Sequence, residues 1–281
     1  MIVNRLRPIC AVLIALAFLT AAATASAQSF VERVTSSNAR MTQFQPSWIT
    51  PIATSDPRLV QYARFSTSHE YTITRTETTN YGNGKGIGLV GGNRFEFDYM
   101  PPGYCQHNSS AIDGFGDMGT LVKYRIASGN ATHGNYIVTA ILSHTFATGS
   151  DKNGAVTDSF GPTMAGGYAF RRFDVVSTLG GTMPTGRIAT QGRTIAWNSL
   201  VQAHVSRTVW VEVENNSSFY FSGSHDGKMQ NFVTPGVYYV VRKKEWKPTH
   251  PFMIFDTGMQ VATSGYHSYN HNLISEIRLL F

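Results

Sequence analysis

Apolar and polar residues alternate with a period of two along most of the chain after residue 68. The clearest run is NRFEFDYM (93–100), in which aromatic residues occupy one face and charged residues the other. Alternation of this kind predicts β-strands with one apolar and one polar face. Similar runs occur at 117–127, 135–147, 194–206 and 208–215, and weaker ones at 70–79, 164–170, 173–182, 236–242 and 251–262.

Clusters of Gly, Asn, Asp and Pro separate these runs and predict turns at 127–135, 147–162, 181–192 and 222–235. The sequence contains no convincing amphipathic helix and no internal repeat of fixed period. Residues 28–57 are polar and proline-rich, which is typical of an arm, a plug or a loop. The chain is therefore expected to be all-β and antiparallel.

Alternation alone does not distinguish a membrane barrel from a secreted β-sandwich, because strands of both carry one apolar and one polar face. Here the polar face carries full charges in mid-strand, which suits the wet lumen of a barrel. Aromatic residues lie near predicted strand ends, where a barrel places its interfacial girdles. We expect an antiparallel transmembrane β-barrel, with a secreted β-sandwich binding protein as the alternative.

The last nine residues, LISEIRLLF, form one more alternating run. An apolar edge strand is prone to aggregation unless it is paired, so we expect it to close the cylinder against the first strand. Bacterial outer-membrane barrels end in this way. The residues expected to form the barrel-assembly signal share the apolar face: Leu273, Ile277, Leu279 and Phe281.

Eleven alternating runs are visible, and bacterial barrels need an even number of strands. The missing strand is expected within 58–66. We therefore predict about 12 strands, with 10 or 14 as alternatives, in a barrel spanning residues 58–281. Residues 28–57 would form a periplasmic arm or a plug.

The N-terminus predicts export. Arg5 and Arg7 precede the apolar stretch AVLIALAFLTAAA, and the small residues ASA (25–27) follow it. This is the pattern of a cleaved secretory signal peptide, residues 1–27. Together with the barrel, it predicts location in the outer membrane, with outer-membrane lipids and the barrel-assembly machinery as partners.

Composition adds little to this picture. Without Arg5 and Arg7, the chain holds 21 basic and 17 acidic side chains, a net charge of +4. The excess is spread along the chain, so no nucleic-acid partner is expected. One cysteine, Cys105, remains after the signal peptide, so no internal disulfide can form.

Three segments resemble a known family: GFGDMGTLVKYRI (114–126), GNYIVTAILSHTFATGSDKNG (134–154) and HDGKMQNFVTPGV (225–237). They are similar to outer-membrane transporters of the family named for the "MetA-pathway of phenol degradation". QPSWITPIATSDPRLVQ (45–61) and NYGNGKGIGLV (80–90) resemble its acidobacterial branch. The resemblance implies a barrel that carries small molecules, apolar or aromatic compounds among them, across the outer membrane. It implies no catalytic residues.

Charged residues on the polar faces are the candidates for selecting what passes through the lumen. The candidates are Arg94, Glu96, Asp98, Lys123, Arg125, Glu212, Glu214 and Arg242. Opposite charges among them are equally expected to pair across the lumen and merely fill it. The predicted function is passive uptake or efflux of a small-molecule substrate, without a cofactor.

The rival class is a barrel enzyme acting on lipid or peptide at the outer surface. Its candidate is the segment GSHDG (223–227), but a nucleophile and its base need mutual hydrogen-bond reach, and this composition is also ordinary in turns. His250, His267 and His271 lack a carboxylate-rich cluster, so no metal site is expected. The sequence therefore predicts a non-enzymatic protein.

Overall fold

The computed structural model describes residues 40–281, except residue 85 and residues 242–251. The predicted signal peptide (1–27), the first part of the predicted arm (28–39) and Arg242 lie outside the described residues.

Fifteen strands form a single antiparallel sheet. They are β1 (Tyr62–Tyr71), β2 (Glu77–Tyr81), β3 (Gly86–Gly91), β4 (Phe95–Met100), β5 (Tyr104–His107), β6 (Gly114–Phe115), β7 (Met118–Gly129), β8 (Tyr136–Phe146), β9 (Ser159–Phe170), β10 (Phe173–Pro184), β11 (Arg193–His204), β12 (Val209–Phe221), β13 (Met229–Val241), β14 (Phe252–Ala262) and β15 (His271–Leu280). Two short helical segments, α2 (Ile188–Gln191) and η1 (Gly223–His225), lie in connections. Among the described residues, no helix is long and apolar enough to cross a membrane.

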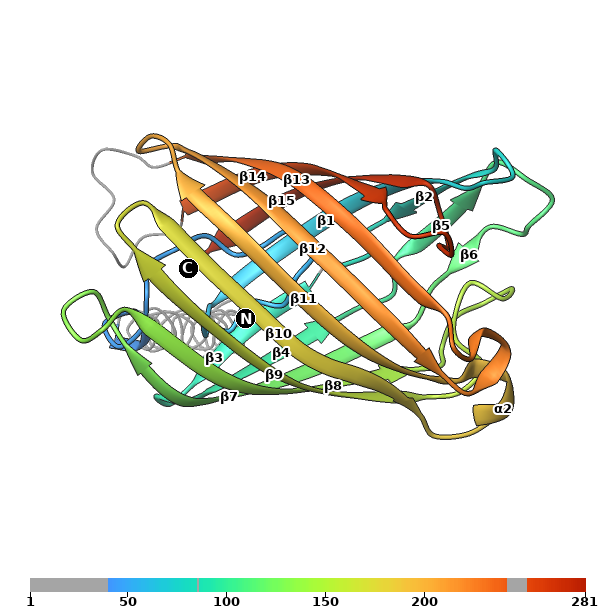
Figure 1. Ribbon diagram of the computed structural model, residues 1–281, viewed down its shortest axis with the longest axis horizontal. Helices are drawn as coiled ribbons and strands as arrows, with labels where there is room; N and C mark the ends of the chain where they lie inside the picture. Colours follow the sequence, from blue (N-terminus) through green and yellow to red (C-terminus); the bar gives the residue numbers. More distant parts are fainter. Residues whose placement is uncertain (1–39, 85, 242–251) are drawn as a thin grey trace, which may run out of the picture.

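The sheet closes on itself, as Figure 1 shows. β15 pairs with β1 along its whole length, from Leu280 opposite Tyr62 to His271 opposite Tyr71. Closure leaves no open edge in the main ring, which is what a membrane barrel requires. The barrel prediction is confirmed, and the β-sandwich alternative is wrong.

The described residues make a ring of twelve strands, which confirms the predicted number. Three of the twelve are interrupted, at 82–84, 101–103 and 116–117. β2, β5 and β6 therefore continue the lines of β3, β4 and β7, respectively, beyond these breaks.

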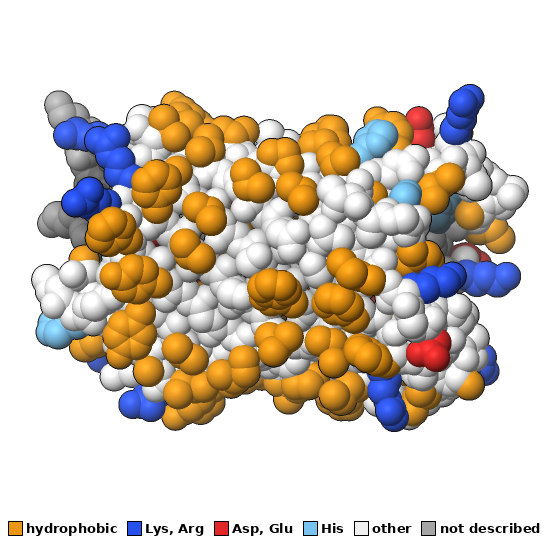
Figure 2. Space-filling view, in the orientation of Figure 1, with side chains coloured by type: hydrophobic (Ala, Val, Ile, Leu, Met, Phe, Trp, Pro, Cys, Tyr) orange, Lys and Arg blue, Asp and Glu red, His pale blue; other side chains and the backbone are white. Residues whose placement is uncertain are grey.

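The two faces of the wall differ in chemistry as the alternation predicts. On β4, Phe95, Phe97 and Tyr99 are exposed on the outside, whereas Glu96 and Asp98 are buried inside. Apolar side chains are spread over the outer wall visible in Figure 2, and Lys and Arg side chains gather at its two ends. This is the surface expected of a barrel whose outside contacts lipid.

The connections distinguish the two ends of the cylinder. Short connections at 92–94, 130–135, 171–172 and 205–208 lie at one end, which we call the turn end. At the other end, the loop end, the connections at 147–158, 185–192, 222–228 and 263–270 are longer, whereas those at 72–76 and 108–113 have five and six residues. β1 begins and β15 finishes at the turn end.

Several predicted element boundaries are wrong. The turns predicted at 127–135, 147–162 and 181–192 each include strand residues, at 127–129, 159–162 and 181–184. The run 70–79 was expected to be a strand, but Thr72 and Thr76 close a hairpin turn there, with Thr72 N donating to Thr76 O at 3.0 Å. Residues 229–235 were assigned to a turn but belong to β13. The strand sought within 58–66 is β1, which begins at Tyr62.

Candidate functional site: the lumen and the segment inside it

Six of the eight predicted selectivity residues point into the barrel and are buried: Glu96, Asp98, Lys123, Arg125, Glu212 and Glu214. The fold brings Glu96 and Lys123 together in an ion pair of 2.7 Å between Oε1 and Nζ. Their strands are neighbours, and the two residues stand opposite each other in the register of β4 and β7. Glu212 and Glu214 lie apart from this pair, on β12.

The prediction that Arg94 faces the lumen is wrong. Residues 92–94 form the turn between β3 and β4, and the exposed Arg94 guanidinium donates to the Tyr124 hydroxyl at 3.2 Å. The alternating pattern of the sequence extends past the start of β4 at Phe95 into this turn, which is why it placed Arg94 on the polar face of the strand. Arg242 lies outside the described residues.

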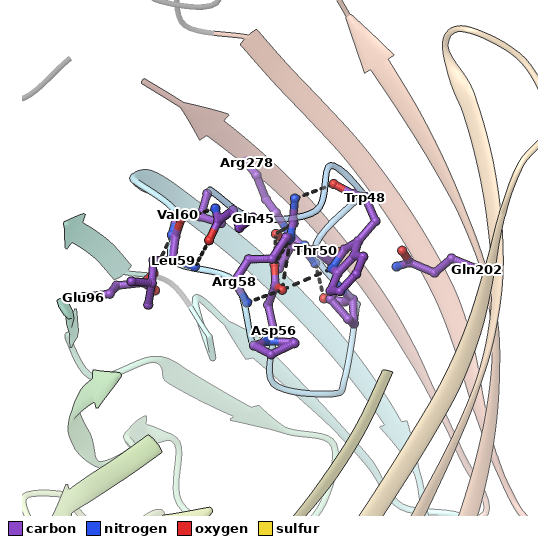
Figure 3. Close-up of polar contacts among 12 residues, drawn as sticks. Gln45, Trp48, Thr50, Asp56, Arg58, Leu59, Val60, Glu96, Gln202 and Arg278 are labelled. Carbon is purple, nitrogen blue, oxygen red and sulfur yellow. Dashed lines mark hydrogen bonds and ion pairs between the residues drawn. The ribbon is translucent and has the colours of Figure 1, made fainter. Parts of the chain in front are cut away.

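Residues 40–61, which we call the inner segment, run from the rim at the turn end, where residues 42–44 are exposed, into the barrel (Figures 1 and 3). They enter beside the β7–β8 connection, where Asn130 Nδ2 donates to Gln43 O at 2.8 Å. Trp48, Ile49, Ile52 and Leu59 are all buried. The segment predicted to be an arm or a plug thus occupies part of the lumen.

Inward charged residues hold the backbone of the inner segment. Glu212 Oε1 accepts from Ile52 N at 3.2 Å, and Glu214 Oε1 accepts from Ala53 N at 2.8 Å. On the other side, Arg278 Nη2 donates to Pro51 O at 2.8 Å. Hydrogen bonds to charged groups are stronger than neutral ones. These wall charges therefore anchor the segment at the bend around residues 50–53.

Asp56 and Arg58 organise the inner segment itself (Figure 3). Arg58 Nη2 lies 2.7 Å from Asp56 Oδ2, and Thr50 Oγ1 donates to the same oxygen at 2.8 Å. Burial alone would raise the pKa of Asp56, but Arg58 and, from the wall, Lys123 hold this pKa below its usual value. The Asp56 carboxylate is therefore ionised and bridges the two arms of the loop.

Glycines in the wall provide recesses for the apolar side chains of the inner segment. A Cβ at Gly167 would lie 2.5 Å from Cη2 of Trp48. One at Gly236 would lie 2.5 Å, and one at Gly258 3.0 Å, from Cδ1 of Ile52. A side chain at Gly167 or Gly236 would have to displace Trp48 or Ile52, and one at Gly258 would be tight. The inner surface of the wall is therefore recessed where the side chains of the inner segment pack against it.

Around these recesses, inward apolar residues form a belt at the turn end that packs with the inner segment. Its members are Ile137, Ala169, Val176, Leu200, Val240, Ile254 and Leu280. Apolar surface facing a water-filled lumen would be unfavourable, at about 25 cal/mol per Å². Trp48, Ile49 and Ile52 bury it.

Two cavities remain in the lumen, and they meet at the first strand break. A cavity of about 310 Å³, which we call the chamber, lies between residues 50–56 of the inner segment and the inward face of β1 and β15. A second cavity of about 560 Å³ lies toward the loop end and is lined by Glu70, Asn80 and His107 among others. Asn83 and Gly84 line both cavities, so the two adjoin at the first break.

Three charged residues that the sequence analysis did not select form another inward cluster. Arg278 Nε lies 2.6 Å from Glu276 Oε2 and 3.3 Å from Asp256 Oδ2. The signal was available for β15, because Glu276 and Arg278 lie on the polar face of the last predicted strand. The sequence contains no pattern that predicts the contacts between the barrel wall and the inner segment.

The described residues give no support to catalysis at GSHDG. Ser224 Oγ donates to Thr190 O at 3.2 Å, and His225 packs against the ring of Tyr266 at 5.2 Å. Ser224 and His225 share no hydrogen bond, and Asp226 Oδ1 accepts from Ser222 N. A nucleophile, base and orienting acid are therefore not assembled.

The fold matches solved outer-membrane channels. The COG4313 outer membrane channel from Pseudomonas putida F1 superposes with a TM-score of 0.55 at 12% identity, over 83% of this chain and 100% of that one. The NanC porin superposes with a TM-score of 0.50 at 10% identity, over 79% of this chain and 98% of that one. At such identities the likeness establishes the barrel fold.

No family model matches the chain, and no curated protein matches it. The likeness to the "MetA-pathway of phenol degradation" family therefore rests on the quoted sequence segments.

Proposed function

We propose that this protein is an outer-membrane channel through which small molecules pass by diffusion, with the inner segment restricting the passage. The observation that supports this most directly is a closed barrel with an apolar outside, a charged inside and adjoining cavities along its lumen. Short turns face the periplasm in outer-membrane barrels, so the inner segment would lie on the periplasmic side.

The lining of the lumen suggests which solutes pass. The chamber is bordered by Arg64, Ser66, Asp98 and Asn272, which favours small polar solutes. Apolar or aromatic solutes, which the sequence resemblance implies, would find an apolar lining in the belt that Trp48 and Ile52 now cover. Such solutes would have to displace the inner segment.

Single-channel recording on refolded protein in planar bilayers tests this function. Wild type is expected to show small or rare conductance steps. Trp48→Ala combined with Ile52→Ala should increase conductance or open probability at least several-fold, because the segment loses the contacts that seat it in the glycine recesses. Truncations of this kind cost about 2–5 kcal/mol each in a packed site.

Arg94→Ala is the matched control, because Arg94 lies in a turn outside the lumen. It should leave conductance unchanged. Folded, inserted protein that conducts in neither form, and that admits no sugar or amino acid into vesicles, would contradict the proposal. Hydrolysis of lipid or peptide that is lost in His225→Ala with folding retained would instead favour the enzyme alternative.

A further inference from the structure

The chamber contains one basic side chain without a direct ion pair among the described residues, although the Asp256 carboxylate acts on it at longer range. Two of its three basic residues are paired with carboxylates: Lys123 with Glu96 at 2.7 Å and Arg278 with Glu276 at 2.6 Å. The third, Arg64, makes no ion pair and no hydrogen bond within the part of the chain that the structure describes. Its Nε is buried without an acceptor.

Arg64 stands beside an acid that is also left with an open position. Its Cζ lies 5.6 Å from the centre of the Tyr62 ring, and the hydroxyl of Tyr62 donates to Asp98 Oδ2 at 2.8 Å. The other oxygen of Asp98, Oδ1, is buried and has no donor among the described residues. Tyr62 thus lies between a cation and an anion that form no ion pair with each other.

Gly88 keeps this arrangement in place. A Cβ there would lie 2.4 Å from Cε1 of Tyr62 and 2.7 Å from Asp98 Oδ1. The wall is therefore recessed where the phenol and the carboxylate meet, and a side chain at this position would displace both.

Neutral hydrogen-bonding groups surround the two charges. The hydroxyls of Ser66 and Ser68 and the Oδ1 of Asn272 line the chamber, are buried, and have no partner within residues 40–281 as described. Buried polar groups are normally hydrogen-bonded. Together with Arg64 and Asp98, they form one wall of donors and acceptors facing a space of about 310 Å³.

We propose that the chamber binds a small zwitterion of the amino-acid class, with its carboxylate on the Arg64 guanidinium and its ammonium on Asp98 Oδ1. A guanidinium matches a carboxylate in shape and charge, and a carboxylate oxygen accepts from an ammonium group. A solute with one charge would leave the opposite side chain unpaired, which is costly in a buried site. The inference rests on the proposed channel function, since the solute reaches the chamber through the lumen.

A set of four solutes of one size tests the site. L-alanine carries both charges, L-lactate lacks the ammonium, alaninol lacks the carboxylate and lactamide lacks both. Binding to refolded full-length protein would be measured by isothermal titration calorimetry at neutral pH. L-alanine is expected to bind at least about tenfold more tightly than each of the others, which corresponds to about 1.4 kcal/mol.

Arg64→Gln and Asp98→Asn should each abolish this preference, and Tyr62→Phe should weaken it while keeping both charges. Arg75→Gln, in the exposed β1–β2 turn, is the matched control and should retain it. Folding of every variant would be checked by the heat-dependent gel shift of closed barrels. Equal binding of the four solutes, no binding of any, or a preference that survives Arg64→Gln would overturn the proposal.

Vesicle swelling separates this proposal from the channel itself. Entry of lactamide and alanine at equal rates, without any preference in binding, would overturn the site and leave the channel standing. Tight alanine binding without entry of any solute would overturn the channel and leave the site standing.

Discussion

Asp56 is the side chain that ties the two arms of the inner segment together. Its carboxylate accepts from Thr50 and from Arg58, and Trp48 Nε1 donates to Oδ1 at 3.3 Å. The pKa of Asp56 lies below its usual value in the folded protein. The stability that the Asp56 carboxylate gives to the inner segment is therefore fully present above about pH 4, the usual pKa of the group. It is lost as the pH falls through the pKa of Asp56 in the folded protein.

Asp56→Asn should reproduce at neutral pH what acid does to the wild type. The uncharged amide loses the ion pair with Arg58, at a cost of about 2 kcal/mol, or about 30-fold in the equilibrium between seated and released segment. The measurement is proteolytic cleavage within the inner segment in intact vesicles, at pH 7 and at pH 3. Glu212 and Glu214 also accept hydrogen bonds from the segment and are unchanged in the variant, so the variant at pH 7 isolates Asp56. Cleavage as slow as in the wild type would contradict this role.

At the residue scale, the alternation predicted which charged side chains point inward. It was correct for Glu96, Asp98 and Lys123, because their parity is fixed once the aromatic face is placed toward lipid. It was wrong for Arg94, since alternation does not show where a strand ends. It also gave no reason to select Arg64, whose importance comes from the absence of an ion pair.

At the element scale, turn chemistry explains which strands could be predicted. Connections rich in Gly and Asn were recognised, whereas the hairpin at Thr72–Thr76 was missed because its residues, TITRT, continue the alternation without Gly or Pro. The opposite error occurred in β13. Pro235 is a residue that normally marks an edge or a turn, yet it stands opposite Val213 within the ladder of β12 and β13.

The last strand, β15, carries the element-scale prediction. Leu273, Ile277 and Leu279 are exposed on the outer face, as predicted, and Phe281 N donates to Gln61 O at 3.3 Å. We expect Phe281→Ser to lower the amount of assembled barrel in the outer membrane several-fold, because the assembly machinery would read this strand less well. The measurement is the fraction of heat-shifting, folded protein in isolated outer membranes.

Phe221→Ser is the control for this experiment, because Phe221 is a phenylalanine at the end of another strand, β12, and is exposed. It should assemble at nearly the wild-type level. Equal loss in both variants would mean that any terminal aromatic residue matters to the same extent, and the assembly-signal interpretation of β15 would fail.

At the scale of the whole molecule, the sequence predicted the barrel but left open whether residues 28–57 form a plug in the lumen or a periplasmic arm. Alternation, the count of runs and the terminal strand are local patterns, and they predicted a closed barrel of about 12 strands. The inner segment is held by contacts such as the 2.8 Å bond between Arg278 Nη2 and Pro51 O, across 227 positions of sequence. No local pattern reports where a proline-rich stretch of chain docks.

The lumen as a whole contains more carboxyl side chains than basic ones. The inward carboxylates of the described strands are Glu70, Glu96, Asp98, Asp174, Glu212, Glu214, Asp256 and Glu276, and the inward basic residues are Arg64, Lys123, Arg125 and Arg278. Asp56 and Arg58 of the inner segment cancel each other, and its remaining charged residue, Arg40, is exposed. Such a lining concentrates cations and repels anions along the path.

We therefore expect the open channel to prefer cations, and Glu70 to contribute to this preference at the loop end, where it lines the cavity of about 560 Å³ without holding the inner segment. Glu70→Gln should move the reversal potential in a KCl gradient toward zero while leaving the conductance steps similar in size, because one lumen charge is removed without changing the width of the path. Glu77→Gln is the matched control, since Glu77 lies on the neighbouring strand β2 near His69, on the opposite face of the wall. An anion-selective channel, or equal shifts in the two variants, would contradict a lumen whose selectivity is set by its inward carboxylates.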